Sequence, residues 1–262
     1  MTSARSRQKP ASKPRKPTAA RMSLDEVMRA LEKAGSAQTK KIYARHGARE
    51  PMFGVRFGTL KVLLDRIGVD QELALALWKT KNQDARNLAM KIADPARIRS
   101  ADLDRWAKEN SMRICGMYIA ALAAEGPHAA AKERDWLASS DEELRAVGWT
   151  LVAQLANLDE KAPDERFAKR LARIEKTIRA APSLERGAMN AALIAIGGRS
   201  AALRKLATAA AERIGPVEVD HGDTACTTPD AVVQIGKLWE RAKKFESPAA
   251  AERARESMRT RC

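Results

Sequence analysis

A short stretch near the end of the chain, GPVEVDHGDTACTTPDA at 215–231, gathers side chains that could do chemistry. Within seven residues it holds two carboxylates, an imidazole and a thiol: Asp220, His221, Asp223 and Cys226. All four can bind a metal ion, but they mix hard oxygen donors with a soft thiolate and match no closed zinc spacing. A metal site is therefore the weaker alternative, and we predict none.

The neighbouring residues favour a structural role for this stretch. Gly215 and Pro216 follow a helical pattern that ends near Ile214, and the DHGDT run is rich in turn-forming residues. Thr228 and Pro229 fit the cap and the first position of a last helix. We therefore predict a turn that docks the final helix.

Catalytic arrangements elsewhere are sparse. The three histidines stand on separate segments, at His46, His128 and His221. No nucleophile elbow and no phosphate-cradling glycine-rich loop is present, so the common cofactor enzymes are disfavoured and we expect no cofactor. Five tryptophans lie on helical apolar patterns, where core packing is the favoured role: Trp78, Trp106, Trp136, Trp149 and Trp239.

The net charge indicates a polyanionic partner. The 262 residues carry 48 Lys and Arg against 33 Asp and Glu, a formal charge of +15. Nucleic acid is the first candidate and an anionic membrane surface the second. No run approaches the roughly 18 apolar residues of a membrane span, and no secretory signal opens the sequence. We expect a cytoplasmic protein with reduced thiols at Cys115, Cys226 and Cys262.

The elements that must position these residues are predicted to be helices. A capping-box spacing of Ser23 and Glu26 opens a helix-period apolar pattern that hardly stops afterwards, and no segment has a convincing strand signal. Short connections imply antiparallel neighbours. We predict helices at about 23–34, 36–46, 54–67, 70–79, 82–93, 100–109, 111–124, 127–138, 140–157, 164–180, 184–197, 200–213 and 229–244.

Three of these helices open alike, with an arginine near the first turn and small residues behind it. The arginines are Arg86, Arg145 and Arg186, separated by 59 and 41 residues. The second spacing falls in the range of HEAT and armadillo repeats, although the first does not. We predict an all-α superhelical stack of antiparallel helix pairs, an α-solenoid whose second helices line a concave surface. A generic helical bundle is the alternative.

This pattern also divides the chain. Residues 1–22 are basic, contain three prolines and lack acidic side chains, which is typical of a disordered arm. Such an arm either adds affinity for nucleic acid or only aids solubility. Residues 23–245 are predicted to form a single HEAT-like-repeat domain, and residues 246–262 a charged C-terminal tail.

Four runs carry a family resemblance that extends from about Ile42 to about Leu238. They are YARHGAREPMFGVRFGTLKVLLDRIG, LALALWKTKNQDARNLAMKI, RDWLASSDEELRAVGWTL and GAMNAALIAIGGR. The chain resembles the bacterial DNA-alkylation-repair family of HEAT-like-repeat glycosylases, in which a VDHGDT-like segment with a cysteine also occurs. The resemblance implies a basic concave face that grips duplex DNA. It also implies hydrolysis of the N-glycosidic bond of cationic N3- and N7-alkylpurines, without metal or cofactor.

The resemblance further implies a site built from a tryptophan and an aspartate on a mid-chain helix, a later tryptophan, and an arginine that holds the DNA backbone. Here Ser111 falls at the first tryptophan position, Cys115 (or Gly116 with a one-residue shift) at the aspartate, and Ala191 at the later tryptophan. Only Arg145 matches. We interpret Cys115 as a core residue, because a thiol does not replace a carboxylate in stabilising a cation.

Two functions therefore stay open at this point: a DNA-binding repair protein that cleaves the glycosidic bond or only binds, and a non-catalytic helical scaffold for an acidic protein partner. For Arg145 the alternative to phosphate contact is a surface salt bridge with Asp141 or Glu142. We expect a monomer that associates with the nucleoid when bound to double-stranded DNA. The candidate phosphate contacts are Lys40, Lys41, Arg45, Arg56, Lys61, Lys79, Lys81, Arg86, Arg113, Arg145, Arg186 and Arg199.

Overall fold

The computed structural model describes residues 21–112 and 115–253, and within them the chain forms fourteen α-helices and no strand. The all-α prediction is confirmed, and each predicted helical segment contains a helix. The first seven are α1 (Leu24–Lys33), α2 (Ala37–Arg45), α3 (Phe57–Ile67), α4 (Gln71–Lys79), α5 (Gln83–Ile92), α6 (Ser100–Glu109) and α7 (Gly116–Ala124). The others are α8 (Ala129–Leu137), α9 (Glu142–Leu158), α10 (Asp164–Thr177), α11 (Ser183–Gly197), α12 (Ala201–Ile214), α13 (Ala231–Arg241) and α14 (Pro248–Arg253).

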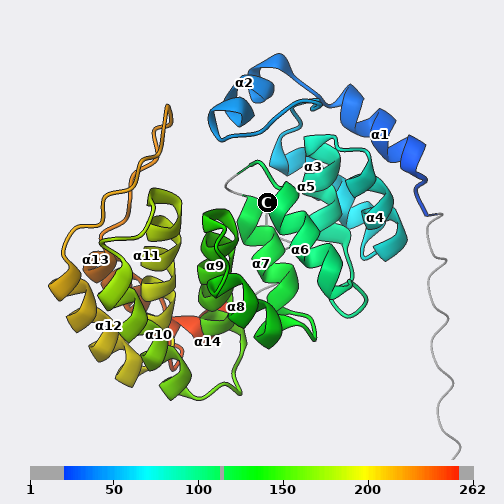
Figure 1. Ribbon diagram of the computed structural model, residues 1–262. Coiled ribbons are helices and arrows are strands. Elements are labelled where there is room, and N and C mark those ends of the chain that lie inside the picture. Colours follow the sequence, from blue (N-terminus) through cyan, green and yellow to red (C-terminus); the bar gives the residue numbers. More distant parts are fainter. Residues whose placement is uncertain (1–20, 113–114, 254–262) are drawn as a thin grey trace, which may run out of the picture.

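The helices stack into an arc whose open side lies at the top of Figure 1. Helix α9 is central, because it packs against α7, α8 and α11, while α12 packs against α10 and α11. Helices α1 and α2 (blue) and the segment between α12 and α13 (orange) stand at the two ends of the opening. The arrangement is the stack of antiparallel helix pairs that the repeat pattern predicts.

Local signals fix where the helices begin. The predicted capping box of α1 is present: the Glu26 N–H donates to Ser23 Oγ at 3.3 Å, and the Ser23 N–H donates to Glu26 Oε2 at 2.7 Å. The hydrogen bond from the Ser23 backbone lowers the pKa of Glu26. Asn82 caps α5 and Asp141 caps α9 in the same way, by accepting from N–H groups of the first turn.

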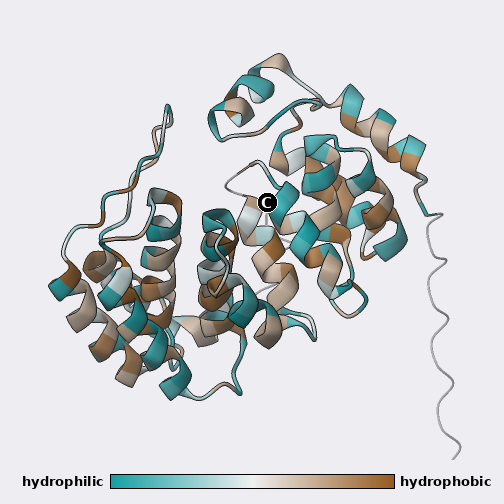
Figure 2. Cartoon of the chain, in the orientation of Figure 1, coloured by the Kyte–Doolittle hydropathy of each residue, from teal (hydrophilic) through white to brown (hydrophobic). Residues whose placement is uncertain are grey.

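One apolar core runs through the whole stack, from Met22 to Ile235. Figure 2 shows hydrophilic residues over most loops and helix ends, with hydrophobic residues along the packed helices. Core packing is confirmed for the tryptophans: four are buried, and Trp239 is half-buried and packs against the core. Trp78 and Trp106 stack face to face with ring centroids 4.3 Å apart, joining α4 to α6.

Helix α3 begins later than predicted, at Phe57. The residues just before it are not helical, because their backbone is hydrogen-bonded to Asp84, which is fully buried at the start of α5. Its carboxylate accepts the backbone N–H groups of Phe53, Gly54 and Val55 at 2.6, 2.9 and 2.8 Å. These N–H groups are satisfied by a side chain from another repeat, which apolar periodicity does not reveal.

The start of the last predicted helix also needs correction. Helix α13 begins at Ala231 and is capped by Asp230, whose Oδ1 accepts the Val233 N–H at 2.9 Å. Thr228, the predicted cap, instead pairs with His221 across the preceding loop. The cap therefore lies two residues further along the chain than predicted.

The C-terminal region differs from the predicted tail as well. Helix α14 packs against α9 and α13, and the Ala249 N–H donates to the Gly198 carbonyl at 3.2 Å. The predicted arm at 1–22 lies outside the described residues except for its last two. Among the described helices, none is long and apolar enough to cross a membrane.

Candidate nucleic-acid interface

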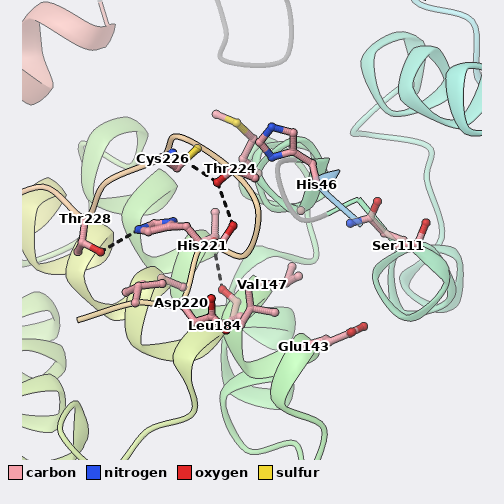
Figure 3. A pocket seen from close by; sticks show the side chains of 18 of the residues that line it. His46, Ser111, Glu143, Val147, Leu184, Asp220, His221, Thr224, Cys226 and Thr228 are labelled. Carbon is pink, nitrogen blue, oxygen red and sulfur yellow. Dashed lines mark hydrogen bonds between the residues drawn. The ribbon is translucent and has the colours of Figure 1, made fainter. Parts of the chain in front are cut away.

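A pocket of about 400 Å³ opens on the inner side of the arc. Helices α7, α9 and α11 supply its floor, as predicted for the second helices of the pairs, and the end of α2 and the loop after α6 border it. Residues 215–230 form the remaining wall. This segment is distinct from the N-terminal residues 1–22, and from here on it alone is called the arm. In Figure 3, Ser111 and Glu143 stand on one side of the pocket and His221, Thr224 and Thr228 on the other, with His46 between them.

Of the residues at the family site positions, some line the pocket and others do not. Ser111 lines the pocket, and its hydroxyl donates to Gln83 Oε1 at 3.2 Å. Gly116 lines the pocket too, at the start of α7. Ala191 is exposed on α11, one turn beyond the lining residue Ala188. The pocket thus lies where the resemblance predicts a site, but with small and hydroxyl side chains.

Cys115 does not face the pocket. It is fully buried, and its Sγ lies 3.0 Å from Asn87 Oδ1. Burial raises the pKa of the thiol far above its usual range, only partly opposed by the Lys91 ammonium. The group stays neutral at physiological pH, so the interpretation as a core residue is confirmed.

The carboxylates that do line the pocket are Glu143, in the first turn of α9, and Asp220, on the arm. Glu143 is exposed. The sequence analysis missed it, because nothing in the run DEELRAVGW distinguishes it from the neighbouring Glu142. Only the packing of α9 beside α7 and α11 places one of these two side chains at the pocket.

The arm is more ordered than a simple turn. His221 Nε2 lies 2.9 Å from Thr228 Oγ1, and the Thr224 hydroxyl donates to the His221 carbonyl at 2.9 Å. The Asp220 carboxylate accepts the Gly222 N–H at 2.8 Å, which is the turn chemistry predicted from the sequence. Across residues 21–112 and 115–253, no three His, Cys, Asp or Glu side chains converge as a metal-binding group.

Arg145 forms an ion pair, but not the predicted one. Its Nε lies 2.7 Å from Oε2 of Glu185 on α11, rather than near Asp141 or Glu142. Its Nη1 also donates to the carbonyls of Ser139 and Ser140, at 3.1 and 2.8 Å. The alternative of a local surface salt bridge is therefore wrong: the arginine ties its own repeat to the next one.

Arg86 and Arg186 have equivalent positions. Arg86 donates to the Glu109 carboxylate at 2.8 Å and to its backbone carbonyl at 3.1 Å, and its guanidinium lies over the Trp78 ring. Burial lowers its pKa, opposed by Glu109. Arg186 donates to the carbonyls of Ala181 and Glu218. The three arginines that suggested a repeat are therefore repeated staples, each joining the preceding loop or helix to a segment further along the stack.

The other candidate phosphate contacts divide by exposure. Lys40 pairs with Glu50, and Lys61 with Asp65, each at 3.2 Å. Arg199 is buried and bound to Asp164 and to two backbone carbonyls, so we leave it out of the proposed DNA surface. Arg113 lies outside the described residues. The exposed members are Lys41, Arg45, Arg56, Lys79 and Lys81, of which Arg45 also lines the pocket.

The stacked helix pairs define an all-α protein of the HEAT-like repeat class. A family model described as DNA alkylation repair enzyme matches residues 27–232. The chain belongs to this family.

Two curated relatives and one solved structure extend the likeness over most of the chain. An uncharacterized protein of Listeria monocytogenes is 26% identical over 226 residues, covering 84% of this chain and 97% of its own length. One from Listeria innocua is 25% identical over 224 residues, covering 83% and 96%. The solved structure has 31% identity and a TM-score of 0.77, and covers 87% of this chain and 98% of its own. It is described as a new family of proteins related to the HEAT-like repeat DNA glycosylases with affinity for branched DNA structures.

Proposed function

We infer that this protein binds branched DNA through the concave side of the helical stack and does not hydrolyse N-glycosidic bonds. The observation that carries this proposal is the lining of the pocket. Cleavage of a cationic alkylpurine is favoured by a carboxylate close to the sugar and aromatic faces against the base. At the matching positions this chain has Ser111 and a buried thiol, and no tryptophan, tyrosine or phenylalanine is among the described residues that line the pocket.

DNA binding itself is supported by family membership, by the net charge of +15 and by the exposed cations of α2 at the opening of the arc. Lys41 and Arg45 have no acidic partner among the ion pairs of the described residues. Contacts from such side chains to phosphates position a protein on DNA without reading its sequence. The stack presents a curved surface to such a ligand, and the structural neighbour has affinity for branched DNA structures.

The test compares three DNA substrates with the full chain: a three-way junction, a linear duplex of the same strand length, and an alkylated duplex. We expect the junction to bind at least about tenfold more tightly than the duplex, equivalent to about 1.4 kcal/mol. Free alkylpurine should be released no faster than spontaneously. Equal affinity for junction and duplex would contradict branch recognition. Release that disappears in Glu143→Gln would contradict the absence of catalysis, since Glu143 is the helix carboxylate at the pocket.

A scaffold for an acidic protein is the second candidate. Binding of neither junction nor duplex at low salt would favour it over DNA recognition, because counterion release makes any protein–DNA contact strongest there.

A further inference from the structure

The pocket itself is poorly suited to a phosphate. Two carboxylates, Glu143 and Asp220, border it, and much of its lining is apolar, as at Met117, Val147 and Val219. Arg45, at the end of α2, is the one Lys or Arg side chain among the described lining residues. A phosphate placed there would lose its hydration and meet like charges. The DNA backbone would therefore follow the exposed cations of α2 at the rim, so that the pocket accepts a different part of the nucleic acid.

We propose that the pocket binds one unpaired nucleobase from the branch point of the DNA. This inference rests on the proposed function, because it needs a branched ligand. A nucleobase is uncharged, has two apolar faces and carries polar atoms only along its edges. The pocket matches these features: apolar side chains such as Val147 and Val219 line it, together with the flat imidazole rings of His46 and His221 and the Glu143 carboxylate.

The space for a base exists because the floor is built from small residues. Ala146 on α9 and Gly187 and Ala188 on α11 line it, so that these helices leave a hollow on the concave side. Its volume of about 400 Å³ lies within the range of small-molecule sites. Leucine at any of these positions would occupy part of that volume.

The pocket is also held open by contacts of the arm. The Asp220 N–H donates to Ser183 Oγ at 2.7 Å, and the Arg186 guanidinium to the Glu218 carbonyl at 3.1 Å. On the other side of the arm, Asn190 Nδ2 donates to the Pro229 carbonyl at 2.9 Å. All three partners lie on α11. Both sides of the arm are therefore fixed to the helix that forms the floor, and little ordering is needed when a base enters.

Glu143 gives this pocket a preference among bases. An ionised carboxylate only accepts hydrogen bonds, so it favours a base edge that offers N–H groups. Guanine presents two adjacent N–H donors on its Watson–Crick edge, which match the two carboxylate oxygens, whereas thymine presents one. A guanine at the branch point is therefore the best occupant. Placing it there costs little, because a base that is already unpaired has no pairing to lose.

The first experiment removes only the base. A three-way junction with one unpaired guanosine at the branch is compared with the same junction carrying an abasic tetrahydrofuran at that position, so that the phosphates are identical. We expect the full chain to bind the guanosine junction about tenfold more tightly, as for a single stacked base. Equal affinity for the two junctions would overturn the pocket inference. Failure to bind either junction would instead overturn the proposed function.

The second experiment uses two matched glutamates. Glu143→Gln removes the carboxylate at the pocket, and Glu142→Gln removes its exposed neighbour, which does not line the pocket. Both variants change the net charge equally. We expect Glu143→Gln to reduce the advantage of unpaired guanosine over unpaired thymidine about tenfold, and Glu142→Gln to preserve it. Identical behaviour of the two variants would contradict base recognition by Glu143.

A third variant tests whether the base enters the pocket and leaves all charges in place. Ala188→Leu fills part of the floor and should remove the advantage of the guanosine junction over the abasic junction. A full guanosine advantage in this variant would show that the base does not enter. Should Ala188→Leu fold poorly, the glutamate pair still tests base binding, because Glu143 and Glu142 are exposed and their replacement leaves the core intact.

Discussion

Cys115 shows how burial decides what a single side chain can do. It occupies the position at which the family resemblance implies a carboxylate, yet it is fully buried and its thiol pKa is strongly raised, first by burial. A charged group at this depth would carry a large desolvation cost. The reactive chemistry of a thiolate is thereby excluded at neutral pH, and the side chain serves packing between α5 and α7.

The raised pKa makes stability depend on pH. In the unfolded chain the Cys115 thiol ionises near its ordinary value of about 8.5, while in the folded protein it stays protonated well above that. The contribution of the protonated thiol to the free energy of unfolding is therefore fully present below about pH 8. It is lost as the pH rises further, by up to about 1.4 kcal/mol per pH unit.

We expect the free energy of unfolding to fall more steeply with pH between about 8.5 and 10 in the native protein than in Cys115→Ala, as measured by urea titration. The variant is the control for all other titrating groups. Parallel curves over this range would contradict a raised thiol pKa.

At the scale of elements, the arginine staples explain why the stack holds together where its repeat spacing is irregular. Each lies near the start of an inner helix, where it reaches both the preceding loop or helix and a later segment of the stack. Glu185 shows how such a contact satisfies a buried group. Its carboxylate is almost fully buried and accepts hydrogen bonds from Arg145 at 2.7 Å and from Trp149 Nε1 at 3.2 Å. Losing the arginine would leave this carboxylate without the cation that is hydrogen-bonded to it.

Arg145→Ala should therefore destabilise the fold by about 3 kcal/mol, because it strands a buried charge. Arg97→Ala is a matched control: its partner pair with Glu72 has side chains 59% and 73% exposed, and such pairs contribute less than about 1 kcal/mol. Urea midpoints of both variants provide the measurement. Equal midpoints would contradict the staple.

The arm is an element whose position depends on α11. Asn190 is almost fully buried and holds the Pro229 carbonyl. We expect Asn190→Ala to cost about 1 to 2 kcal/mol and to speed amide exchange within residues 217–228, since one of the attachments is lost. Ala191→Ser, at the exposed neighbour, should leave exchange unchanged. An unaltered exchange pattern in Asn190→Ala would show that this hydrogen bond does not hold the arm.

At the scale of the whole molecule, charge and curvature act together. The excess of 15 positive charges favours nucleic acid, while the arc decides which cations reach it. Lys41 and Arg45 lie on α2 at the opening, whereas Lys169 and Lys176 lie on α10, which contributes nothing to the pocket. Net charge alone would treat these two pairs as equivalent.

The salt dependence of junction binding separates them. If Lys41 and Arg45 each contact a phosphate, the Lys41→Ala/Arg45→Ala protein should show a slope of log affinity against log salt that is smaller in magnitude by about 1.8. Lys169→Ala/Lys176→Ala removes the same number of charges and should keep the native slope. A common change in both double variants would show that overall charge, rather than the α2 cations, sets the affinity.

The amino-acid sequence by itself determined the helical class and nearly all helix positions, because apolar periodicity and capping residues such as Ser23 are local signals. It also singled out Ser111 and Gly116, which line the pocket. What it missed are contacts between repeats: the three N–H groups held by Asp84, the Glu185 partner of Arg145, and the place of Glu143 at the pocket rather than its twin Glu142. Only the tertiary structure decided these contacts, because they depend on how helices that are distant in the sequence pack together. A local sequence pattern does not show which distant residues will meet.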